Sequence, residues 1–126
     1  MIVADTDVLI EFLRGRDPFA ERVAVEIRRG LATTAVTAFE LLAGAHTTRQ
    51  NKAVTDLLDG LTVLSLDTAA AASAARVRRT LEKSGAGIGM ADSLIAGICL
   101  SCEAVLMTAN VKHFSRVPDL VLARNP

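Results

Sequence analysis

The chain has 126 residues, of which 51% are hydrophobic, 22% charged and only 3% aromatic, and its formal net charge is zero. This length suits one domain (residues 1–126) with an aliphatic core, and the neutral charge excludes a uniformly basic nucleic-acid-binding surface. No apolar run approaches the roughly 20 residues that cross a bilayer, the N-terminal residues lack the basic region of a signal peptide, and two cysteines make no disulfide framework, so we expect a cytoplasmic protein without a membrane segment.

The first half of the chain alternates short apolar runs with helical patterns. Residues 2–4 form an apolar run that predicts a buried strand, and residues 8–14 and 18–29 predict two helices, each closed by a glycine. Residues 31–36 predict a second strand. Thr37 and Glu40 then match a capping box at the start of an apolar helix, and a short helix is expected over residues 53–58.

The second half continues the alternation. The expected strands are residues 61–66, 104–107 and 120–122, the last at a sheet edge, and the expected helices are 67–83, 88–102 and a turn over 111–114. The helix 88–102 is apolar on nearly all sides and should be buried. Strands separated by helices predict an α/β sandwich with a central parallel sheet of four to five strands.

Two acids lie at places where a carboxylate has either a structural or a chemical role. Asp5 ends the first strand, and ligands of open parallel sheets bind beyond the carboxyl ends of strands, but an aspartate there is also a favoured helix N-cap. Glu40 can serve a site, or it can satisfy an N–H group of its own helix as the last residue of the capping box.

Asp92 stands among apolar neighbours in the helix 88–102. A carboxylate on a buried helix is costly unless it is paired or bound to a metal, which favours function. The alternative is an acid in the first helical turn that interacts with the helix dipole. Together with Asp5 and Glu40, Asp92 makes an oxygen donor set suited to Mg²⁺ or Mn²⁺, provided that the fold brings the three together.

Four segments in order resemble the VapC-type PIN-domain ribonucleases, the toxin half of toxin–antitoxin pairs. They are Ile2 to Ile10 around Asp5, Thr37 to Leu41 around Glu40, Ala91 to Ala96 around Asp92, and Thr108 to Phe114. No single segment is specific, but four in this order within one short chain are. The resemblance implies a PIN fold, Mg²⁺- or Mn²⁺-dependent cleavage of RNA, a homodimer, and inhibition by a VapB-like antitoxin.

The resemblance also implies roles for residues. Asp5, Asp92 and Glu40 are expected to hold the metal and, with Asn110, to form the catalytic set; the possible supporting residues are Asp7, Thr6, Thr108 and His113. Many PIN nucleases carry a fourth acid at the position of Asn110 or three residues later, where this chain has His113. Asn110 is expected to orient a water or bind metal through its carbonyl oxygen, and His113 is a candidate contact to phosphate.

Two other functions stay open. Asp5-Thr6-Asp7 after a strand partly matches the motif of haloacid-dehalogenase-like phosphatases, with Asp5 as nucleophile, although Leu9 replaces the usual residue. A PIN fold that has lost turnover and only binds a partner is the non-enzymatic alternative. Arginine and lysine clusters such as Lys112 with Arg116 are either solvated helix faces or RNA contacts.

Overall fold

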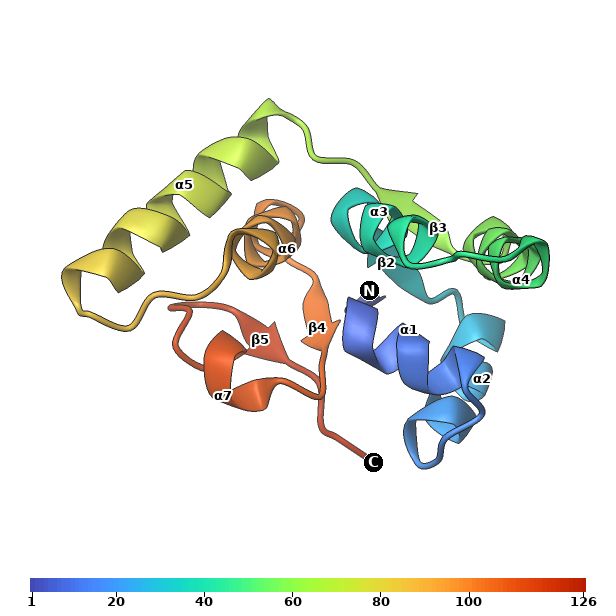
Figure 1. Ribbon diagram of the computed structural model, residues 1–126. Coiled ribbons are helices and arrows are strands. Elements are labelled where there is room, and N and C mark those ends of the chain that lie inside the picture. Colours follow the sequence, from blue (N-terminus) through green and yellow to red (C-terminus); the bar gives the residue numbers. More distant parts are fainter.

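Five parallel strands form one sheet in the order β3-β2-β1-β4-β5 in the computed structural model, which describes residues 1–126 (Figure 1). The strands are β1 (Ile2–Ala4), β2 (Ala32–Thr34), β3 (Thr62–Leu64), β4 (Val105–Met107) and β5 (Val121–Leu122). The helices are α1 (Thr6–Leu13), α2 (Phe19–Arg28), α3 (Ala35–Ala43), α4 (Thr48–Asp59), α5 (Thr68–Lys83), α6 (Met90–Ser101) and α7 (Val111–Phe114). The predicted α/β class and parallel sheet are confirmed.

Helices cover both faces of the sheet, as a parallel sheet requires. Successive strand residues point to opposite faces, so that Val3 and Leu106 pack against α5, α6 and α7, whereas Ala4 and Met107 pack against α1, α2, α3 and α4. Figure 1 shows these two helical layers on either side of the central strands. The core is therefore two aliphatic clusters separated by the sheet.

The prediction for the residues before Glu40 is wrong in one respect. The expected strand 31–36 ends at Thr34, whose hydroxyl caps α3 by accepting the Thr37 N–H at 3.1 Å. Thr37 therefore lies inside the helix and is not its N-cap. A Thr-Ala-Val-Thr run offers two capping hydroxyls, and only the packing of the helix decides between them.

A capping box is present one helix later. Thr47 and Gln50 cap α4 reciprocally, so the helix begins at Thr48 and not at the expected residue 53. In the remaining predicted elements, no end is displaced by more than two residues, and the strand 2–4 and the turn 111–114 are found with the predicted ends.

Helix α6 is the most deeply placed helix, as predicted. Its residues Ile95 to Cys99 are buried, and a Cβ atom on Gly97 would lie 2.5 Å from the backbone nitrogen of Ala74 in α5. The two helices thus approach closely because position 97 has no side chain. Cys99 lies in this buried stretch, and burial raises the pKa of its thiol to about 12, whereas Cys102 is exposed.

No helix combines the length and the apolarity needed to cross a membrane.

Candidate functional site

The carboxyl edge of the sheet near β1 and β4 is where the predicted site residues gather. The chain runs outward from β1 through β2 to β3 and then returns to β4 on the other side of β1, so the topology switches between β1 and β4. Such a switch point leaves a crevice beyond the strand ends. Helices α1 and α3 begin at this edge because they follow β1 and β2, and α6 begins there because it leads back into β4.

Asp5 is the buried acid of the site, with only 4% of its surface exposed. One carboxylate oxygen accepts the Val8 N–H at 3.1 Å and so caps α1, and the other accepts the Thr108 hydroxyl from the residue after β4. Burial raises the pKa of Asp5 to about 6, the negative charges of Asp7 and Asp92 add to the rise, and the two hydrogen bonds oppose it. Asp5 can therefore be both the N-cap of α1 and an acid of the candidate site, the two roles that the sequence left open.

Glu40 lies in the second turn of α3 and is partly exposed. Its Oε1 accepts the Thr6 hydroxyl at 2.6 Å, and Thr6 Oγ1 is also 3.0 Å from Thr37 Oγ1. The carboxylate caps no helix end, so the capping-box interpretation of Glu40 is wrong. Its partner is a residue of the first segment, next to Asp5.

Asp92 lies in the first turn of α6, where the helix dipole favours an acid. The expectation that it is a buried carboxylate is wrong, since 28% of its side chain is exposed and the helix becomes buried only from Ser93 onward. It is nevertheless close enough to Asp5 to raise that residue's pKa, and its Oδ2 is 3.5 Å from His113 Nδ1. Asp5, and not Asp92, is the acid whose burial demands an explanation.

Asn110 and His113 form a pair at the far side of Asp92. Asn110 Nδ2 lies 3.0 Å from His113 Nδ1, and the Asn110 N–H donates to the Thr108 hydroxyl at 2.9 Å. The last motif therefore connects Asp5 to Asp92 through Thr108, Asn110 and His113. The exposed Lys112 adds positive charge beside this pair, and the remaining supporting candidate, Asp7, is exposed on α1.

The three acids do not contact one another directly. Glu40 accepts from Thr6, Asp5 accepts from Thr108, and Asp92 lies beside His113. No three His, Cys, Asp or Glu side chains of the chain lie close enough together to hold an ion between them. The donor set still fits a hard cation, because Mg²⁺ commonly binds through one or two carboxylates and keeps several waters. Asp5 also retains unused lone pairs after its two hydrogen bonds.

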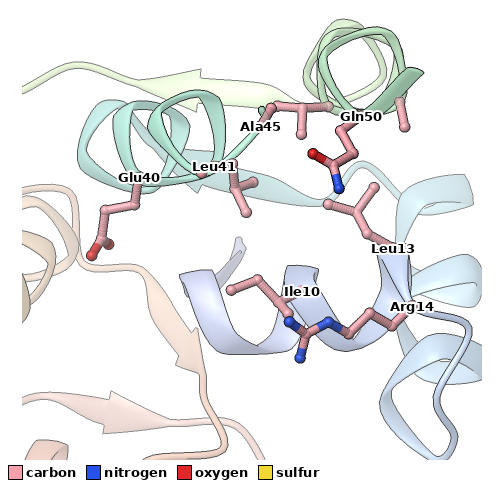
Figure 2. Close-up of a pocket in the computed structure, with 10 residues that line it drawn as sticks. Ile10, Leu13, Arg14, Glu40, Leu41, Ala45 and Gln50 are labelled. Carbon is pink, nitrogen blue, oxygen red and sulfur yellow. The ribbon is translucent and has the colours of Figure 1, made fainter. Parts of the chain in front are cut away.

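Two hollows flank Glu40. One, of about 380 Å³, lies between α1, α3 and α4, with Glu40 at one end and Arg14 at the other (Figure 2). The second, of about 360 Å³, is almost purely apolar and contains the exposed side chains of Phe39, Met90 and Leu66.

Among the side chains that are hydrogen-bonded around Glu40, Thr37 is the one for which the sequence suggested no site role. The signal that identifies it is the spacing of Thr37 and Glu40, three residues apart and thus on one helix face, once Thr34 is taken as the cap.

The sequence matches a family model described as PIN domain over residues 2–120. Ribonuclease VapC19 of Mycobacterium tuberculosis is 33% identical over 123 residues, which are 95% of this chain and 97% of the relative. The tRNA(fMet)-specific endonuclease VapC of Salmonella typhimurium is 30% identical over 121 residues, 92% of this chain and 91% of that one. Among solved structures, VapBC2 of Rickettsia felis, bound to a DNA fragment from its promoter, superposes with a TM-score of 0.87 at 25% identity and covers 100% of both chains.

Proposed function

The chain belongs to the PIN-domain family, in its VapC branch, and from this premise we propose that it is a divalent-cation-dependent endoribonuclease, the toxin of a toxin–antitoxin pair. The observation that carries the proposal is the buried carboxylate of Asp5 at the switch point of the sheet, with Asp92 close enough to raise its pKa. A buried acid with a raised pKa in such a crevice is typical of a reactive site. We also propose a cytoplasmic location, because the proposed RNA substrate and antitoxin are both found there.

In this proposal Asp5 and Asp92 would hold Mg²⁺ or Mn²⁺, directly or through water, and Glu40 would either bind the cation or orient the attacking water. When bound, the cation would activate a water for attack and would stabilise the negative charge on the phosphate oxygens. Thr108 keeps Asp5 in place through its hydrogen bond. His113, whose Nδ1 lies 3.5 Å from Asp92 Oδ2, would keep Asp92 in place, and Asn110, which contacts His113, would face the phosphate. Without the cation, the clustered carboxylates repel RNA.

The test is cleavage of end-labelled RNA, including an initiator tRNA, by the pure protein with Mg²⁺ or Mn²⁺ and with EDTA. We expect cleavage only with the cation, and a loss of about a hundredfold or more in Asp5→Asn. The control is Asp59→Asn, because Asp59 is an exposed carboxylate at the end of α4. Activity that survives both EDTA and Asp5→Asn contradicts the mechanism, and a folded protein that binds antitoxin but never cleaves RNA favours the pure binding module.

The phosphatase alternative has lost its support. Asp7, its required second acid, is exposed on the surface of α1, and the chain belongs to another family.

We further propose that an apolar segment of the antitoxin occupies the groove between α1, α3 and α4. Its walls include Ile10, Leu13 and Leu41, and Glu40 lies at its end, so an occupant would also cover a site acid (Figure 2). Ala45→Arg should therefore abolish antitoxin binding and leave RNA cleavage intact. Ala75→Arg on the exposed side of α5 is the matched control, and unchanged binding by Ala45→Arg contradicts the assignment.

We also propose that the chain forms a homodimer, and that the apolar hollow around Phe39, Leu66 and Met90 is its interface. Phe39 is 70% and Met90 67% exposed, and an exposed aromatic beside an exposed methionine is typical of protein interfaces. Met90→Asp places a charge in this apolar interface, and the first turn of α6 tolerates an acid. The variant should therefore fold but have the mass of a monomer when measured by light scattering. A dimer of unchanged mass contradicts this interface.

A further inference from the structure

We propose that the hydroxyl groups of Thr6 and Thr37 are positioning groups for Glu40, and that together they hold its carboxylate in the orientation in which it acts. The inference rests on the proposed function, since it concerns the same site. It assigns a role to Thr37, which touches Glu40 only through Thr6.

The geometry is a chain of three polar side chains that joins two helices. Thr6 is the first residue of α1, whereas Thr37 and Glu40 stand one turn apart on α3. Thr6 Oγ1 is 2.6 Å from Glu40 Oε1 and 3.0 Å from Thr37 Oγ1. The contacts span 34 and 31 residues of sequence, so they exist only when both helices are packed.

Counting protons settles the direction of this chain. An ionised carboxylate only accepts, so the single hydroxyl proton of Thr6 is donated to Glu40. The 3.0 Å contact between the two hydroxyls then requires Thr37 to donate to Thr6. The bonds run from Thr37 through Thr6 to Glu40, and each strengthens the next by polarisation.

Burial separates the two ends of the chain. Thr37 is 0% exposed, so its hydroxyl has no access to water and depends on Thr6 for a partner. Glu40 is partly exposed between two hollows and forms no ion pair. A glutamate in that position has several rotamers available, and the hydrogen bond from Thr6 selects one of them.

A similar arrangement holds a second acid of the site. Asp5 accepts the hydroxyl of Thr108, which comes from the end of β4. Each of these two acids is thus held by a threonine of a different element, and only Glu40 has a second threonine behind the first.

The first experiment compares Thr37→Val with Thr37→Ser in steady-state RNA cleavage. Valine keeps the shape and removes the hydroxyl, so we expect kcat to fall about tenfold while KM stays within about twofold, because substrate does not touch Thr37. Serine restores the hydroxyl and should bring kcat back to within about threefold of the unmodified protein. Circular dichroism checks that both variants are folded, and a Thr37→Val variant with unchanged kcat overturns the inference.

The second experiment does not depend on activity. Urea unfolding of Thr37→Val, Glu40→Ala and the double variant measures whether the two side chains are coupled. We expect non-additive midpoints, and we expect the coupling to disappear when the same three variants are made in a Thr6→Val background. Additive midpoints overturn the inference whether or not RNA is cleaved. If Thr37 and Glu40 are coupled but the protein cleaves no RNA under any condition, the proposed function is rejected and the hydroxyl chain is retained.

Discussion

Asp5 combines a buried position with a negative charge, and this sets how the fold responds to pH. Its pKa in the folded chain, about 6, lies above its ordinary value of 3.8 because burial disfavours the charged form. The folded chain therefore binds this proton more tightly than the unfolded chain does. The resulting contribution to stability is complete below pH 4 and is lost as the pH rises through 6.

The first prediction follows from this loss of stability with rising pH. In EDTA, the free energy of unfolding of Asp5→Asn should exceed that of the unmodified chain by about 3 kcal/mol at pH 7, and the difference should shrink to about 0.5 kcal/mol near pH 4. Asparagine remains a good N-cap, so the helix start is preserved. Urea titrations at pH 4, 5, 6 and 7 measure the difference. A gap that stays constant across this range contradicts the assigned pKa.

Single residues also show where the sequence was misleading. Asp92 stood in an apolar segment and was expected to be buried, yet the first turn of α6 is open to solvent. Asp5 followed a run of only three apolar residues and is the buried acid, because neighbouring strands and helices close over it. Periodicity along one helix does not report which of its turns the rest of the fold covers.

At the scale of elements, the close approach of α5 and α6 makes the site's position dependent on one glycine. Because the Cβ of an alanine at position 97 would lie 2.5 Å from Ala74 backbone atoms, the helices would have to move apart. Helix α6 carries Asp92 in its first turn, so such a movement displaces a site acid as well.

The second prediction is therefore that Gly97→Ala destabilises the fold by about 2 kcal/mol or more, although alanine is the better helix former. Gly87→Ala is the matched control, since a Cβ there meets nothing within 4 Å and we expect a change of less than about 0.5 kcal/mol. Thermal unfolding of both variants provides the comparison. Equal melting temperatures would mean that the helix pair repacks without loss.

A capping pattern in the sequence does not by itself show where a helix begins. Thr37 and Glu40 match a capping box, but Thr34 is the N-cap of α3, so the side chains of Thr37 and Glu40 are free to contact Thr6. A cluster of candidate site residues here has the sequence pattern of a local capping motif.

At the scale of the whole molecule, a neutral chain is proposed to bind a polyanion. Its candidate site carries excess negative charge from Asp5, Asp92 and Glu40, which the proposed cation would offset. Binding of that cation to the folded state alone should raise stability by mass action.

The third prediction is that Mn²⁺ at about 100 times its dissociation constant stabilises the chain by about 2.7 kcal/mol, seen as a higher melting temperature. Asp5→Asn and Asp92→Asn should largely abolish the shift, while Asp59→Asn should retain it. A shift of equal size in all four proteins would place the cation elsewhere.

The sequence by itself determined the order of strands and helices, the parallel α/β class and the family resemblance, since these depend on periodicity and on short motifs within continuous segments. It also located Asp5 at a strand end, because an apolar run that stops at an acid is a local feature. Only the tertiary structure decided that Thr108 meets Asp5 across 103 residues and that Thr6 meets Glu40 across 34. Those contacts arise from the order in which strands pair in the sheet, and no local pattern encodes that order.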